Sequence, residues 1–114
     1  MHELYRLVQQ VTEDTPRSTP RVSTHLAARC SGDGRAWRAT MLSLSESGCL
    51  VRSSEPLNLG SLIELEFELP RSGGMRLRAE AAYQLLPDIG LIFHGLDPEH
   101  RDAISDFVTL TLRP

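Results

Sequence analysis

The first apolar stripe of the chain has the spacing of a helix. Residues 4–11 carry apolar side chains at i, i+3, i+4 and i+7, namely Leu4, Leu7, Val8 and Val11. This spacing predicts a short N-terminal helix with one apolar face. Residues 12–20 follow with two prolines among Thr, Ser and acidic residues. Because proline cannot continue a helix, we expect an exposed, extended connector there.

From residue 21 onward the apolar positions recur with a period of two, which is typical of β-strands. The alternation predicts strands over residues 22–30, 36–44, 49–52, 62–69, 75–85 and 89–93. Turn residues separate these runs, including a four-residue connection over residues 31–34. Several short antiparallel strands of this kind favour a small β-barrel or closed roll.

Two neighbouring strands carry opposite charges on their polar faces. Strand 62–69 has a glutamate ladder, Glu64, Glu66 and Glu68. In strand 75–85, Arg76 and Arg78 stand on the polar side, and we expect them to pair with the ladder. The apolar side of that strand is predicted to run from Met75 to Tyr83 and Leu85, with Ala82 and Gln84 facing the other way.

A second helix is predicted near the C-terminus. Asp97-Pro98-Glu99 provides an N-cap, a proline at the first helical position and an acid in the first turn. The apolar stripe that follows consists of Ile104, Phe107, Val108 and Leu112. The chain is therefore expected to be mainly β, with this helix covering an open end. We expect one domain over residues 15–114, preceded by an N-terminal extension over residues 1–14.

Composition narrows the class of protein. The 114 residues are 40% hydrophobic and 24% charged, which is a globular balance. No apolar run approaches the roughly 18 residues of a membrane span, and the N-terminus lacks the features of a signal peptide. We therefore expect a soluble cytoplasmic protein without a membrane partner.

Charge is unevenly distributed along the chain. The net charge is −3, and an acidic chain is a poor partner for nucleic-acid polymers, whose binding needs many phosphate contacts. Residues 17–40, however, hold five arginines against one aspartate, a local charge of +4. This basic segment favours a small anionic ligand.

The sequence gives no positive argument for catalysis. It contains none of the common nucleophile, P-loop, zinc-protease or dinucleotide motifs, and its four histidines are scattered. Cys30 and Cys49 have no CxxC spacing, so we interpret both as buried apolar groups, with a redox pair as the alternative if the fold brings them together. We expect no catalytic residues, no metal and no cofactor.

Two short segments do carry candidate ligand-binding residues. Arg17 and Arg21 lie four residues apart in a proline-containing segment, where Pro16 precedes the first and Pro20 precedes the second. Each guanidinium can grip a phosphate, or the O6/N7 edge of guanine. The second segment, residues 43–48, offers two hydroxyls expected to point outward, Ser43 and Ser45, and Gly48, which permits a tight turn. Ser47 in the same turn is a further candidate.

The order and spacing of these segments, RxxxR followed one hairpin later by SxSxxG, resemble the PilZ domain, a bacterial receptor module for cyclic di-GMP. The resemblance runs from about residue 15 to 108 and includes Pro56-Leu57-Asn58-Leu59-Gly60 and Gly90-Leu91-Ile92-Phe93. It implies a six-stranded antiparallel barrel followed by a helix. It also implies that Arg17 and Arg21 clamp the ligand, that Ser45 bonds it and that Gly48 lets the backbone approach it.

One position departs from the family pattern. Ser43 stands where the family has Asp or Asn, and a hydroxyl accepts poorly from guanine N1–H and N2–H together. The main hypothesis is a cyclic di-GMP receptor in second-messenger signalling, of the kind linked to motility and biofilm formation, that moves its N-terminal segment and acts on an unknown effector protein. The alternative is a PilZ-like adaptor that binds proteins but no nucleotide. The stripe over residues 4–11 also leaves a homo-oligomer open.

Overall fold

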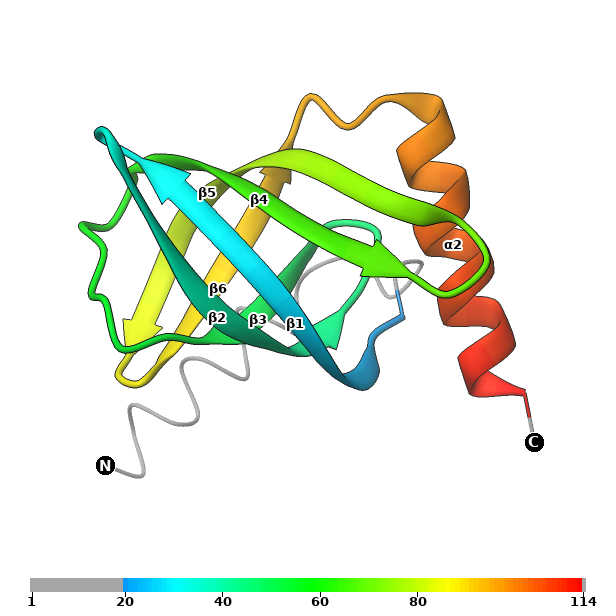
Figure 1. Cartoon of the computed structure of the whole chain (residues 1–114). Coiled ribbons are helices and arrows are strands. Elements are labelled where there is room, and N and C mark those ends of the chain that lie inside the picture. The colour runs from blue at the N-terminus through cyan, green and yellow to red at the C-terminus, as the bar shows by residue number, and fades with distance from the viewer. Residues whose placement is uncertain (1–19, 114) are drawn as a thin grey trace.

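Six antiparallel strands close into a barrel, and one helix follows them (Figure 1). This computed structural model describes residues 20–113, so the predicted helix over residues 4–11 and most of the connector lie outside it. The strands are β1 (Val22–Gly32), β2 (Arg35–Leu44), β3 (Gly48–Arg52), β4 (Leu62–Leu69), β5 (Gly73–Leu85) and β6 (Asp88–His94), followed by α2 (Pro98–Leu112). Their order around the barrel is β1-β2-β3-β6-β5-β4, and β4 pairs back onto β1. The predicted mainly-β barrel with a C-terminal helix is confirmed.

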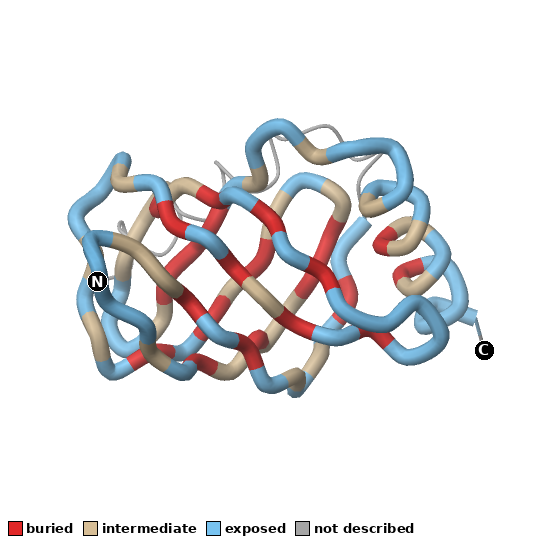
Figure 2. Tube along the Cα trace, turned by 45° about the horizontal axis from the view of Figure 1, so that its top comes forward, coloured by how far each residue is buried: buried red, intermediate tan, exposed pale blue. Residues whose placement is uncertain are grey.

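The core fills the barrel from the inward positions of every strand, as the alternation of buried and exposed positions in Figure 2 shows. Met41, Leu65 and Ile89 are completely buried there. Ile104 and Val108 of α2 are also buried and join the same core. The helix therefore closes one end of the barrel, where the β2–β3 and β4–β5 turns also lie (Figure 1).

The predicted helix cap, a predicted arginine–glutamate ion pair and the two predicted buried cysteines are present in the structure. The Asp97 side chain accepts a hydrogen bond from the His100 amide at 2.9 Å and caps α2. Arg76 bridges to Glu66 at 3.0 Å and lies 4.0 Å from Glu64, which confirms the cross-strand pairing for this arginine. Both cysteines are free and buried, as predicted.

The first hairpin is tighter than predicted. Gly32 pairs with Arg35, so the connection has two residues, Asp33 and Gly34, instead of four. Both adopt positive φ, 52° and 74°. Two consecutive positive φ values are the signature of the turn that best matches the twist of paired strands, and Asp-Gly is a preferred sequence for it.

A β-bulge near the end of β5 shows that the predicted inward and outward sides of residues 82–85 are wrong. Ala81 pairs with Leu91 and Tyr83 pairs with Gly90, so Ala82 is an extra residue in the ladder. The alternation reverses after it, because a one-residue slip moves every later side chain to the opposite face. Tyr83 is therefore only half-buried and Leu85 is exposed, whereas Gln84 accepts a hydrogen bond from the Leu57 amide at 2.7 Å.

The structure also bears on membrane insertion. Within residues 20–113, no helix has both the length and the apolar character needed to cross a membrane.

Candidate ligand-binding site

Strand pairing places four residues in one row across the outer wall of the barrel. Ser43 pairs with Leu50, Leu50 with Gly90, and Gly90 with Tyr83. The row faces outward because its neighbours along the strands, such as Leu91, are buried in the core. We call Ser43, Leu50, Gly90 and Tyr83 the outer row.

The Tyr83 ring lies flat against the backbone of β6. A Cβ added at Gly90 would overlap three ring carbons of Tyr83, so only glycine leaves room for this ring position. An isolated glycine inside a strand often marks such a close approach. The ring thus covers part of the outer wall and presents an aromatic surface beside Leu50.

Arg21 lies near enough to this wall for its charge to act on Tyr83. Burial raises the pKa of the Tyr83 hydroxyl, and the nearby positive charge of Arg21 opposes that rise, while Asp88 and Cys49 add to it. Arg21 itself is exposed and immediately precedes β1. Asp88 is bound by Arg52 at 3.0 Å, so its charge is largely compensated. Strand pairing therefore puts the aromatic ring and the half-buried Ser43 on one wall, and Arg21 precedes the strand that pairs with Ser43.

The β2–β3 turn next to Ser43 is organised by Ser45. The Ser45 Oγ accepts hydrogen bonds from the amides of Ser47 and Gly48 at 3.2 and 3.3 Å, and the Ser45 amide donates to the Gly48 carbonyl at 2.9 Å. Ser45 is only 4% exposed, so the expectation that its hydroxyl points outward is wrong. Its hydroxyl is committed to the turn, because buried polar groups are satisfied internally.

The packing of β3 against β6 explains why residue 48 is a glycine. A Cβ at this position would overlap the carbonyl oxygen of Leu91 in β6. The next contact along the same strand is a hydrogen bond from the Phe93 amide to the Ser47 carbonyl at 2.9 Å. Glycine is therefore needed here to let β6 approach the start of β3, whatever else the turn does.

The remaining predicted residues divide between the described and undescribed parts of the chain. Pro16 and Arg17 lie outside the described residues. Pro20 and Ser47 are exposed, and Ser43 is half-buried. Of the eight candidates, the structure thus brings Arg21 and Ser43 to the wall and Ser45, Ser47 and Gly48 to the adjoining turn.

Sequence reasoning missed Leu50 and Tyr83 as parts of this wall. The available signal was Gly90, a glycine inside a predicted strand, which indicates a close approach by a neighbouring group. Among residues 20–113 no cluster of three His, Cys, Asp or Glu side chains could hold a metal ion. The groups on the wall suit anion binding and ring stacking.

Comparison with known families now adds to this geometry. The family model described as the PilZ domain matches residues 15–110, which include the outer row, the β2–β3 turn and both arginines. The chain belongs to the PilZ domain family. No curated protein matches the sequence at a significant level.

Solved structures share the PilZ fold with this chain. The PilZ domain of YcgR from Escherichia coli, solved with c-di-GMP, has a TM-score of 0.69 at 13% identity, covering 85% of this chain and 92% of that one. The Bacillus subtilis inhibitor of motility MotI has a TM-score of 0.73 at 14% identity, covering 88% of this chain and 54% of its own.

A third PilZ-fold structure is PlzA from Borreliella burgdorferi in complex with c-di-GMP. Its TM-score is 0.65 at 17% identity, and the match covers 90% of this chain and 45% of PlzA. This chain therefore spans about half the length of MotI and of PlzA. At these identities the likeness concerns the fold.

Proposed function

We propose that this PilZ domain is a receptor for cyclic di-GMP, which it binds on the outer wall between the β2–β3 turn and Tyr83. Family membership supports the ligand class, since YcgR and PlzA were solved with c-di-GMP. The observation that carries the proposal is the outer row, in which strand pairing puts Ser43 and Tyr83 on one wall. Arg21 directly precedes the part of β1 that pairs with Ser43 and Leu44.

Each group on the wall has a task that suits its chemistry. The Arg21 guanidinium offers a planar fork to a phosphate or to the O6/N7 edge of guanine. The Tyr83 ring stacks on a guanine face, and Ser43 bonds its polar edge. Ser45 and Gly48 act on the ligand through the turn that they shape.

The segment before β1 completes the proposed site. Arg17 is the first arginine of the RxxxR motif, and Pro16 and Pro20 restrict the backbone directly before each arginine. Ligand that bridges Arg17 and the barrel would rearrange the N-terminal segment and so signal to an effector protein. The protein then works as a receptor and adaptor in second-messenger signalling, without catalysis.

Isothermal titration calorimetry with cyclic di-GMP tests this proposal and gives the stoichiometry. Arg21→Ala removes a charge-assisted contact worth about 1.5–3 kcal/mol, and Tyr83→Ala removes base stacking worth about 1–3 kcal/mol. We expect Arg21→Ala to abolish measurable binding and Tyr83→Ala to weaken it at least fivefold, while Tyr83→Phe keeps most of the affinity. Melting temperatures of the Arg21 variant should stay close to wild type.

The control is Arg29→Ala, since Arg29 is an exposed arginine on β1 that pairs with Arg38 and Glu66, outside the outer row. It should bind like wild type. Wild-type affinity in Arg21→Ala would refute the site. No binding by the wild-type protein would favour the alternative, an adaptor that acts by protein contact alone, for which Ser43 in place of Asp or Asn is the supporting observation.

A further inference from the structure

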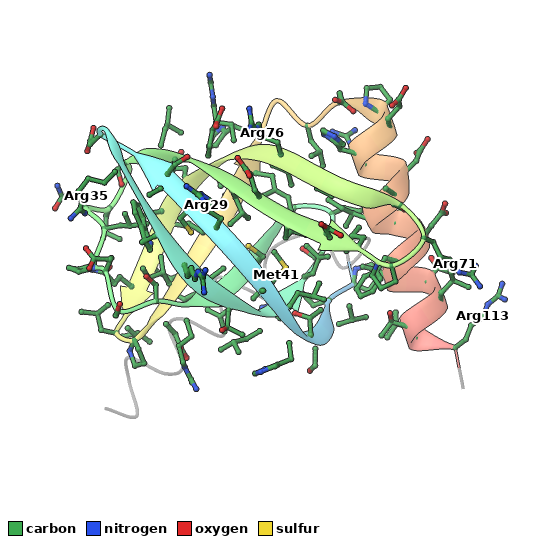
Figure 3. All side chains as sticks on the ribbon, viewed as in Figure 1. Arg29, Arg35, Met41, Arg71, Arg76 and Arg113 are labelled. Carbon is green, nitrogen blue, oxygen red and sulfur yellow. The ribbon has the colours of Figure 1, made fainter. Side chains whose placement is uncertain are left out.

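A cleft lies between the β4–β5 turn and the second half of α2, apart from the outer row. It has a volume of about 630 Å³. Pro70, Phe107 and Leu110 supply apolar surface, and Arg71 and Arg113 line it from the turn and from the end of the helix. Figure 3 shows both arginine side chains projecting on this side of the molecule.

The two arginines of the cleft have no ion-pair partner among the described residues. Arg35, Arg52 and Arg76 each form an ion pair with a carboxylate. Among residues 20–113, neither Arg71 nor Arg113 forms one, although Asp106 also lines the cleft. The cleft is therefore lined by two positive charges, one negative charge and apolar side chains. This lining favours an anionic occupant with an apolar part.

Arg71 is also an unusual residue for its turn. Its φ is 79°, a left-handed backbone conformation that glycine or asparagine adopts with less strain. Strained residues of this kind often mark functional positions. The turn therefore holds an arginine where glycine or asparagine would be less strained, and that arginine lines the cleft.

The cleft has the features of a protein-docking site. Leu110 of α2, which lines the cleft, is 40% exposed, so apolar surface in the cleft is open to a partner. Arginine binds carboxylates through two parallel hydrogen bonds and is enriched at interfaces. A concave shape suits side chains of a peptide better than it suits the flat surface of a membrane.

We propose that this cleft binds an acidic, leucine-containing segment of a partner protein, with carboxylates on Arg71 and Arg113 and an apolar side chain against Phe107 and Leu110. The cleft and the outer row share no residue. The inference therefore stands independently of nucleotide binding. Together, the two sites would connect nucleotide binding to partner binding.

Fluorescence anisotropy of the full-length chain with a labelled synthetic peptide, in which Glu-Glu pairs flank Leu-Leu, tests the proposal. A peptide with Gln in place of every Glu is the ligand control. We expect the acidic peptide to bind at least tenfold more tightly than the Gln peptide. Arg71→Gln combined with Arg113→Gln should reduce its affinity at least tenfold, and Leu110→Ser should also reduce it.

The matched protein control is Arg29→Gln combined with Arg38→Gln, which removes two directly opposed arginines from the convex wall. Equal loss in this control would show non-specific charge attraction and overturn the proposal. Binding of wild type to phosphatidylserine vesicles without binding to the peptide would also overturn it, in favour of a membrane surface. All variants should retain wild-type circular dichroism.

Cyclic di-GMP titration of the same variants separates the two hypotheses. We expect Arg71→Gln/Arg113→Gln to bind the dinucleotide as wild type does. Peptide binding without dinucleotide binding would leave the cleft proposal intact and refute only the receptor function. The acidic peptide failing to bind wild type, with or without dinucleotide present, would refute the cleft proposal.

Discussion

At the scale of single residues, Ser45 is best understood as the acceptor that holds the β2–β3 turn. Replacing it with alanine leaves the amides of Ser47 and Gly48 without their bonds to the Ser45 hydroxyl. Unsatisfied buried donors cost about 1–3 kcal/mol, so we expect Ser45→Ala to lower the free energy of unfolding by about that amount in urea denaturation. Ser47→Ala, at an exposed position, should have a clearly smaller effect. Equal stability of both variants would contradict the structural role.

Ser43 has a different part, because it belongs to the outer row and is half-buried. A carboxylate there can accept from guanine N1–H and N2–H together. We expect Ser43→Asp to tighten cyclic di-GMP binding by about 1–2 kcal/mol, roughly five- to thirtyfold by calorimetry. Ser23→Asp adds the same charge on the strand directly opposite and should not tighten it. Weaker binding by Ser43→Asp would mean that the β2–β3 turn lies differently relative to the guanine base than the proposed site requires.

At the scale of strands and turns, Gly48 tests how closely β3 and β6 approach each other. The Cβ of Gly48→Ala would overlap the Leu91 carbonyl oxygen, and backbone atoms in a ladder cannot move away cheaply. Overpacking of this kind costs about 1–3 kcal/mol, so we expect a lower melting temperature. Gly74→Ala is the control, since nothing lies within 4 Å of its added Cβ. Equal melting temperatures for the two variants would refute the close approach.

The elements also show where sequence reasoning succeeds. The start of α2 could be predicted because a cap depends on Asp97 and the three residues that follow it. The strands could be predicted because alternation is local to each strand. Arg21, Ser43 and the β2–β3 turn became candidates through the chemistry of two short segments whose order resembles a family motif, and strand pairing supplies their arrangement.

Features that depend on strand register could not be read in this way. Ala82 has no property that marks it as the bulge residue, and only pairing with β6 turns Tyr83 to the outer wall. The burial of Ser45 likewise results from the turn geometry, which the spacing of serines does not encode. The outer row joins four strands, so its composition required the barrel itself.

At the scale of the whole molecule, two buried cysteines make the fold less stable at alkaline pH. Burial raises the pKa of Cys30 from 9.0 to about 11, and burial together with the charge of Cys30 raises the pKa of Cys49 further. A thiol whose pKa is higher in the folded state contributes stability that is complete below about pH 9 and is lost as the pH rises through 11. For Cys30 alone this loss is about 3 kcal/mol.

Urea denaturation at pH 8, 9 and 10 in the presence of a reductant should therefore show a steep fall in the free energy of unfolding. The Cys30→Ala/Cys49→Ala variant is less stable at pH 8, because it removes buried side chains, but its stability should fall less between pH 8 and 10. A fall as steep as in wild type would mean that other groups cause the alkaline sensitivity.

Signalling by the whole chain rests on the proposed bridge between Arg17 and the barrel. A ligand shifts a segment only through its different affinity for the two arrangements, so binding should alter the N-terminal segment if Arg17 holds the ligand. We expect hydrogen exchange with cyclic di-GMP to show increased protection across residues 12–21 and 43–48 and a change over residues 4–11. The Arg21→Ala variant under the same ligand concentration should show none of these changes. Protection confined to residues 43–48 in wild type would mean that Arg17 does not hold the ligand and that the signal leaves through another surface.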